Sequence, residues 1–193
     1  MPVYVLPEME NAEFKDLDLF TQGYIQAMFF TNQSCIPMCE FHTAESQHLI
    51  REGQADGDLP NDAGFADLHP DALIDIIADC VAFQIANPEL LAQAVDCEGY
   101  DMERAGMDFW YTRNGHGVGY WSRDELEQVG LHESFGSPRV GDPRWSEYHD
   151  AREDNLARKL TDAVEGWGEV NPWFSEVEEP DSATGFGFVY HDS

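Results

Sequence analysis

Four residues near the middle of the chain have side chains suited to acid–base chemistry. Asp108, Arg113, Asn114 and His116 fall within one short stretch, and a glycine flanks His116 on each side. An imidazole titrates near neutral pH, and one held between glycines can be exposed and mobile enough to transfer protons. The alternative is that these groups cap a turn or hydrogen-bond a neighbouring loop. No nucleophile elbow, phosphate loop or HExxH pattern accompanies them, so the sequence favours a protein that is not an enzyme.

A second group could bind zinc, because it combines two thiols and two imidazoles: Cys35, Cys39, His42 and His48. Its spacing, Cys-x3-Cys-x2-His-x5-His, is not one of the standard zinc-knuckle spacings, and Pro37 interrupts it. We therefore expect a connecting loop that leads into a short helix over 43–51, with no metal and no other cofactor. The four cysteines of the chain fit free thiols in a reducing cytoplasm better than a disulfide framework.

The strongest compositional feature is negative charge. The chain has 38 acidic and 10 basic residues, a formal net charge of −28, and only two lysines, Lys15 and Lys159. Such a chain repels nucleic acid and anionic membranes and favours a basic protein as its partner. Two explanations stay open: the acidity imitates a phosphate backbone, or it reflects solubility and salt adaptation. The acidic surface is predicted to include six carboxylates: Asp71, Asp75, Asp79, Glu176, Glu178 and Glu179.

Residues 108–124, DFWYTRNGHGVGYWSRD, are predicted to form an aromatic β-hairpin. Asn-Gly between two aromatic, alternating runs is a strong hairpin signal, and it places Asn114 and Gly115 at the φ > 0 positions of a type I′ turn. Both faces of such a hairpin carry aromatic rings, so both need cover, unless one of them is a binding surface. The candidate binding residues are Trp110, Thr112, Arg113, Asn114, His116 and Trp121.

Other segments must position this motif. Apolar periodicity predicts helices over 16–32, 69–86, 88–95 and 148–165, with Pro70 at the first helical position of the second. An acidic linker is expected over 96–106. Strands are expected over 169–174 and 184–191, and in the second the aromatic residues Phe186, Phe188 and Tyr190 recur with a period of two. With the hairpin they would form an antiparallel sheet of about four strands covered by helices, an α+β fold in one domain over 1–193.

Three segments are predicted to lack regular structure: a lead-in over 1–14, a long loop over 124–147 and an acidic loop over 175–183. The first residues have neither a basic region nor a long apolar run, so no signal peptide is expected. No apolar run is long enough to cross a bilayer. A cytoplasmic protein follows from these patterns.

The chain resembles a known family in three segments: DLFTQGYIQAMFF, LHPDALIDIIADCVAFQ and DFWYTRNGHGVGYW. It is similar to small acidic proteins encoded widely by bacteriophages and plasmids, whose hallmark DFWxTRNGHGxGFWD is matched over 108–121. It departs from that family over 35–59, after Trp121 and before Thr184. The resemblance implies a virus- or plasmid-borne accessory protein acting in the host cytoplasm, in a family without a settled biochemical activity.

Two functions fit these observations. In the first, the protein inhibits a host DNA-binding or defence protein as an acidic mimic of DNA, and binds no nucleic acid itself. In the second, it is a small accessory protein whose aromatic hairpin binds a partner or ligand, and its acidity reflects salt adaptation. The oligomeric state is open in both.

Overall fold

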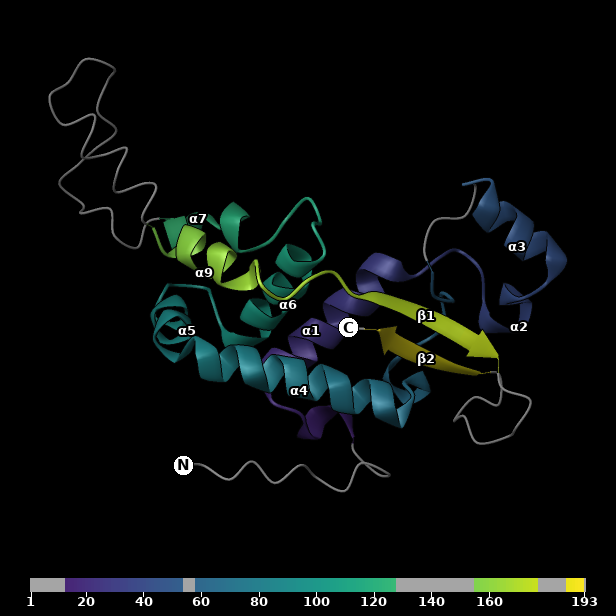
Figure 1. Cartoon of the computed structure of the whole chain (residues 1–193), viewed down its shortest axis with the longest axis horizontal. Coiled ribbons are helices and arrows are strands. Elements are labelled where there is room, and N and C mark those ends of the chain that lie inside the picture. Colours follow the sequence, from purple (N-terminus) through teal and green to yellow (C-terminus); the bar gives the residue numbers. More distant parts are fainter. Residues whose placement is uncertain (1–12, 54–57, 128–154, 177–186, 193) are drawn as a thin grey trace, which may run out of the picture.

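The computed structural model describes residues 13–53, 58–127, 155–176 and 187–192 (Figure 1). Its α-helices are α1 (Leu19–Asn32), α2 (Met38–Phe41), α3 (Ala44–Arg51), α4 (Pro70–Ala86), α5 (Pro88–Val95), α6 (Met102–Arg113), α7 (Asp124–Glu127) and α9 (Leu156–Val164). Short 3₁₀ helices occupy Phe14–Asp16, Phe65–Asp67 and Tyr120–Ser122. The strands are β1 (Asn171–Glu176) and β2 (Gly187–Asp192). An α+β fold is therefore confirmed, although helices dominate it.

Two helices cross at the centre of the fold with their backbones in close contact. Of the described helix pairs, α1 and α6 make the most extensive contact. A Cβ atom at Gly23 would lie 1.9 Å from the Glu103 carbonyl oxygen, and one at Gly106 would lie 1.8 Å from the Phe20 carbonyl oxygen. Glycine is thus required on both helices, because any side chain there would push them apart. Gly23 and Gly106 therefore set how closely α1 and α6 approach.

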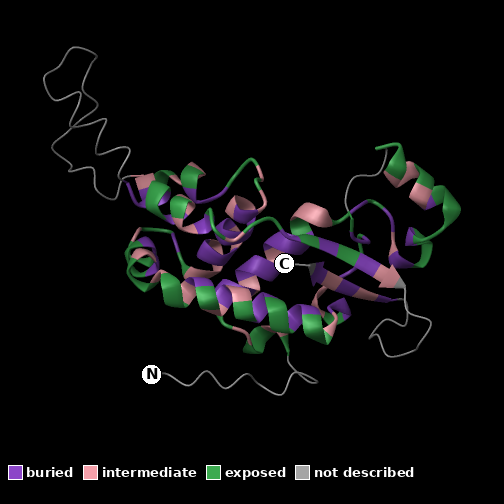
Figure 2. Ribbon diagram, in the orientation of Figure 1, coloured by how far each residue is buried: buried purple, intermediate pink, exposed green. Residues whose placement is uncertain are grey.

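Aromatic side chains fill the core around this crossing. Phe83 of α4 stacks on Phe109 of α6 with ring centroids 4.2 Å apart, and Tyr24 meets Trp110 edge-on at 5.1 Å. All four side chains are buried, and Figure 2 shows buried residues running through α1 and α6 while exposed residues lie on the outer side of α4. The apolar stripes predicted for the first two long helices are thus core-facing.

Polar side chains cap the N-termini of several helices. The carboxylate of Asp18 accepts hydrogen bonds from the backbone N–H and the hydroxyl of Thr21 at 3.1 and 2.6 Å at the start of α1. Asp101 accepts from Arg104 N at 2.8 Å at the start of α6, and Asn155 caps α9 in the same way. Each cap satisfies a backbone donor that has no partner inside the helix.

The two predicted C-terminal strands are confirmed as an antiparallel pair. Asn171 pairs with Asp192, and the register continues to Glu176 opposite Gly187. Alternation turns Phe174 and Val189 inward, where both are buried. It turns Trp173, Tyr190 and Phe188 to the outer side of the sheet. β2 lies beside α4, and His69 N donates to the Val189 carbonyl oxygen at 2.9 Å.

The predicted hairpin over 108–124 is wrong, and with it the sheet of about four strands. Residues up to Arg113 continue α6, which begins inside the predicted acidic linker, and Asn114 has φ −98°. Gly115 alone of the pair has positive φ, at 63°. Gly115 N bonds Thr112 O at 3.4 Å and His116 N bonds Tyr111 O at 3.0 Å, which is the Schellman arrangement that ends many helices. Asn-Gly thus provides a helix C-terminus here.

Several predicted boundaries fall partly beyond the described residues. The predicted lead-in over 1–14 lies outside the described residues except for positions 13 and 14. Of the long loop, only the part that forms α7 is described, and the 175–183 loop is described only up to residue 176. α1 begins three residues later than expected, and α9 covers the second half of the predicted 148–165 helix. Within the described part, no helix is both long and apolar enough to cross a membrane.

Candidate functional site

The Arg113 side chain is the hub of a buried polar network. Its Nη1 donates to Asp79 Oδ2 at 2.6 Å and to the Tyr24 hydroxyl at 3.2 Å. Its Nε donates to Gly168 O at 2.8 Å, and Nη2 donates to Trp167 O at 3.2 Å. One guanidinium therefore connects α6 with α1, α4 and the segment that leads into β1. Charged hydrogen bonds of this kind are stronger than neutral ones.

The network continues from Tyr24 to the sheet. The Tyr24 hydroxyl lies 2.9 Å from His191 Nε2 on β2. Because a guanidinium can only donate, the hydroxyl accepts from Arg113, and the imidazole tautomer sets the direction of its hydrogen bond with His191. Burial raises the pKa of Tyr24 well above its ordinary value, although the nearby Arg113 charge opposes the shift. Tyr24 is thus a neutral link between the arginine and the imidazole.

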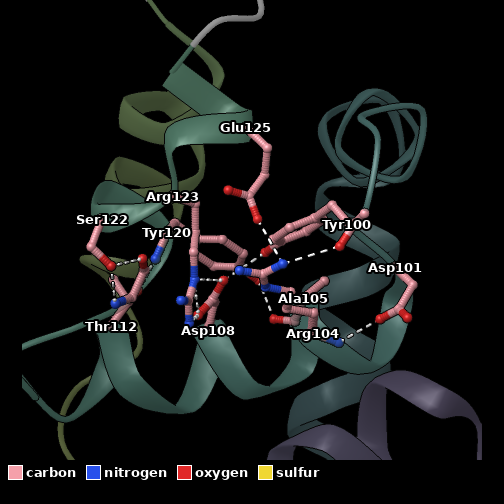
Figure 3. Close-up of polar contacts among 12 residues, drawn as sticks. Tyr100, Asp101, Arg104, Ala105, Asp108, Thr112, Tyr120, Ser122, Arg123 and Glu125 are labelled. Carbon is pink, nitrogen blue, oxygen red and sulfur yellow. Dashed lines mark hydrogen bonds and ion pairs between the residues drawn. The ribbon is translucent and has the colours of Figure 1, made fainter.

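Asp108, the first residue of the motif, is fully buried and belongs to a separate ion pair (Figure 3). Both of its oxygens accept from Arg123 Nε, at 2.9 and 2.8 Å, and Oδ1 also accepts from Arg123 Nη2. The Tyr100 hydroxyl donates to Oδ2 at 2.9 Å. Hydrogen bonding to this carboxylate raises the pKa of Arg123, whereas burial raises that of Tyr100. The carboxylate therefore fastens the segment after the motif to α6.

The small polar residues of the motif hold the turn in place. Asn114 donates from Nδ2 to Trp110 O at 3.0 Å and accepts from Val170 N at 2.8 Å, joining the end of α6 to the start of β1. Thr112 Oγ1 accepts from Tyr120 N at 3.1 Å. A Cβ atom at Gly119 would lie 2.4 Å from this Thr112 oxygen, so the close approach requires glycine.

The candidate binding residues of the motif have different environments. Trp110 is 1 % exposed and donates from Nε1 to Thr31 Oγ1 at 2.8 Å, so its ring is part of the core. Arg113 is also buried. Trp121 is 50 % exposed and available to a partner. The hairpin face predicted to present these residues together does not exist, because the helix directs them to different sides.

His116 has an unusual position among them. Its Nε2 is buried without a hydrogen-bond partner among the described residues, and its ring lies near Tyr111 with centroids 6.1 Å apart. Burial lowers the pKa of His116 below its ordinary value, so the neutral imidazole is favoured. Asp108 and Arg113 are each engaged in another ion pair, and among the described residues neither forms a hydrogen bond with His116 Nε2. The four residues considered for acid–base chemistry thus do not converge on one point.

A hollow of about 300 Å³ lies at the end of the motif. Thr112 and Arg113 form one side of it, and α9 together with the segment before β1 forms the other. Glu165 and Glu169 line it as well, so a ligand here would meet carboxylates.

The predicted acidic residues are also separated by the fold. Asp71 and Asp75 are exposed on successive turns of α4, and an Asp71 oxygen lies 3.7 Å from His69 Nδ1. Asp79, one turn further, pairs with Arg113 and does not contribute a free charge. Glu176 ends β1, and its side chain lies outside the described part, as do residues 178 and 179.

The predicted metal-ligand candidates are dispersed. Cys35 and Cys39 are exposed free thiols, while Cys80 is buried in the core, where burial raises its pKa. Across the residues that the structure describes, no three His, Cys, Asp or Glu side chains lie close enough together to hold a metal ion.

The partners of the motif are not predictable from the local sequence. Asp79 was visible only as a member of a series of aspartates, and nothing local marked it as the one that pairs with Arg113. Tyr24, His191 and Arg123 carried no signal, because their roles arise from contacts between distant segments. The scarcity of cations was the available clue, since in so acidic a chain a buried arginine must find a carboxylate.

Comparison with known proteins gave no match: no protein-family profile, curated protein or solved structure is significantly similar to this chain. The resemblance to the phage and plasmid family stays a prediction.

Proposed function

We propose that this protein binds a basic nucleic-acid-binding protein, as an acidic mimic of DNA, and inhibits it. The pairing of cations carries the proposal. Five of the Lys and Arg residues form ion pairs with carboxylates of the chain: Lys15, Arg104, Arg113, Arg123 and Arg158. The pairs of Arg113 and Arg123 lie largely inside the protein. These five pairs neutralise equal numbers of both signs, so the remaining carboxylates still outnumber the remaining cations by 28.

The face that best suits such a partner combines charge with aromatic rings. We call it the α4–sheet face, formed by Asp71, Asp75, His69, Tyr190 and Trp173. His69 stacks on Tyr190 at 4.7 Å, and Tyr190 stacks on Trp173 at 4.5 Å. Asp71 lies beside the imidazole at the edge of this stack. Aromatic rings that are exposed or half-buried, together with carboxylates, suit the arginines and lysines of a basic surface.

The charge spacing limits how closely α4 alone imitates DNA. Carboxylates four residues apart are separated by about 6 Å along the helix axis, against about 3.4 Å for phosphates on one DNA strand. The Asp71–Asp75 array therefore has roughly half the linear charge density of a strand. Mimicry requires further carboxylates around the α4–sheet face, and the aromatic stack supplies contacts that DNA does not make.

Affinity capture from bacterial extract tests the proposal. Immobilised wild-type protein should retain nucleic-acid-binding proteins, identified by mass spectrometry, and added duplex DNA should release them. The double variant Asp71→Asn/Asp75→Asn should retain less. A matched control, Asp96→Asn/Glu98→Gln, removes the same charge from exposed positions after α5, at the other end of α4.

Two results would count against the proposal. If added DNA does not release the retained proteins, they are not bound through their DNA-binding surfaces, and the protein is not a mimic of DNA. Equal losses in the two double variants would favour the alternative, in which the acidity is a general adaptation and no particular face binds.

A further inference from the structure

The solvent-facing side of α4 carries a line of apolar residues. Ile74, Ala78, Val81 and Ile85 follow one another at steps of four, three and four residues, and Ala82 lies beside them, so all five share one side of the helix. Ile74 is 37 % exposed and Ile85 is 58 % exposed, while both alanines are exposed and Val81 is half-buried. We call these five residues the α4 ridge, and Figure 2 shows the exposed side of the helix to which they belong.

The opposite side of α4 is apolar as well. Leu73, Ile76 and Phe83 are buried in the core there. A helix that is apolar on all sides is normally covered on all sides. Single exposed apolar residues are common on protein surfaces, but apolar residues gathered into one contiguous patch mark places where another molecule binds. The α4 helix therefore has the composition of a helix covered on both sides, whereas the described part of the chain covers one.

Carboxylates border the α4 ridge on both sides. Asp71 and Asp75 are exposed and, by the helical repeat, lie along one border. On the other border, Gln84 Nε2 donates to Asp18 Oδ1 at 3.2 Å, so the exposed carboxylate that caps α1 lies beside α4. The ridge is therefore an apolar line between acidic margins, on a chain whose net charge is −28.

We propose that the α4 ridge is the docking surface for an amphipathic helix of the partner, with basic residues on both sides of its apolar face. Partner helices commonly bind through apolar anchors spaced by three or four residues, which is the spacing of the ridge. The acidic margins select lysine and arginine at the flanks of that helix. That the helix belongs to a nucleic-acid-binding protein rests on the proposed function, but the recognition of a basic helix does not.

Charge and area argue against the other occupants. A second copy of this chain would bring another net charge of −28 and its own acidic margins to the ridge. At about 1.5 Å per residue the ridge is roughly 16 Å long, and one helix presents a strip about 10 Å wide. A specific dimer buries about 800 Å² on each chain, several times the area of this strip. Anionic membranes and nucleic acid are repelled by the carboxylates.

Binding of model peptides to the intact protein tests the proposal. The probe is a capped, fluorescently labelled 18-residue helix with leucines along one side and lysines elsewhere, used at a concentration at which it is monomeric. One control peptide has the same composition in scrambled order, and another has glutamine in place of lysine. Fluorescence anisotropy should show saturable one-to-one binding of the basic amphipathic helix and weaker binding of both controls. No binding of the helix, or equally tight binding of either control, would overturn the proposal.

Matched variants locate the binding on the α4 ridge. Ile74→Gln/Ile85→Gln should weaken binding of the basic helix on the order of tenfold, because two half-exposed side chains no longer gain from burial. The control Phe30→Gln/Val95→Gln changes two exposed apolar residues on α1 and α5 and should leave binding nearly unchanged. Equal weakening in the two double variants would contradict the proposal. Glutamine has at least the helix propensity of isoleucine, so the ridge variant should unfold at the same urea concentration as wild type.

Other occupants of the ridge would give different results. If a second copy covers it, sedimentation should show a wild-type dimer that Ile74→Gln/Ile85→Gln dissociates. If another segment of this chain covers it, the same variant should unfold at a lower urea concentration, and the basic helix should not bind to wild type. Either result would overturn the proposal.

The two proposals can fail separately. If the basic helix binds at the ridge but the protein releases no DNA from any basic protein, the docking surface stands and the DNA-mimic function is wrong. If DNA is released equally by wild type and by Ile74→Gln/Ile85→Gln, the function stands and the docking surface is wrong.

Discussion

Replacing Gly106 by alanine is the sharpest test of the architecture, because the expected sign is opposite to that of an ordinary helix. In an exposed helix, Gly→Ala stabilises by about 1 kcal/mol. Here the new Cβ atom would lie 1.8 Å from the Phe20 carbonyl oxygen and 2.7 Å from the Phe20 carbonyl carbon. A comfortable carbon–oxygen contact is about 3.3 Å, so the helices must separate by roughly 1.5 Å.

The magnitude follows from what this separation disrupts. Both clashing groups are on or next to the backbone, so no rotamer change relieves them, and the aromatic core around Phe109 must follow the helix. Overpacking of a core costs typically about 1–3 kcal/mol, and sometimes more. Since whole helices must move, we expect a net destabilisation of about 2–4 kcal/mol after the propensity gain. This corresponds to a fall in Tm of roughly 4–16 °C for a chain of this size.

Urea unfolding followed by circular dichroism measures the effect. Gly23→Ala should behave like Gly106→Ala, because its Cβ atom meets the Glu103 carbonyl oxygen across the same crossing. The double variant should lose less than the sum, since the helices have already moved apart. Gly166→Ala is the control, with nothing within 4 Å of its Cβ and no positive φ. A Gly106→Ala variant that is as stable as wild type, or more so, would refute the close crossing.

Three further predictions concern the motif. Asp108→Ala should destabilise by about 3 kcal/mol, because it leaves the Arg123 charge without its partner, and a double-mutant cycle with Arg123→Met should show strong coupling; additive losses would argue against the pair. Gly115→Val should cost on the order of 1–3 kcal/mol through strain at φ 63°, measured as a lower Tm, and an unchanged Tm would contradict the helix-ending turn. His116 has a lowered pKa in the folded state, so the unfolded chain binds the proton more readily. Its contribution to stability is therefore full above the ordinary pKa of 6.5 and falls as the pH drops below it. Between about pH 5 and 7, the unfolding midpoint should depend less steeply on pH in His116→Gln than in the wild type. Parallel pH profiles of the two proteins would show that His116 does not contribute to this pH dependence.

Local signals were sufficient for the elements whose role is local. The apolar stripes of α1 and α4, the Pro70 start and the alternating aromatics of β2 each specify an element through its own side chains. The α+β class follows from them.

The motif was misread because one residue pattern serves two structures. Asn-Gly provides a positive φ, which a type I′ hairpin needs at both positions and a Schellman turn needs only at Gly115. The choice depends on Asp101 capping α6, on Gly106 packing against α1 and on Arg113 reaching Asp79. The Asp101 cap is local, but the other two contacts join distant segments, so the local sequence could not decide between the two.

The release of DNA from a basic protein tests the central proposal most directly. Labelled duplex DNA is bound to each of a panel of purified non-specific DNA-binding proteins and restriction endonucleases, and fluorescence anisotropy is followed as this protein is added. We predict that at least one of them releases its DNA, that the effect weakens steeply as salt rises, and that Asp71→Asn/Asp75→Asn reduces it more than Asp96→Asn/Glu98→Gln. Unchanged anisotropy across the whole panel at low salt would contradict the proposal.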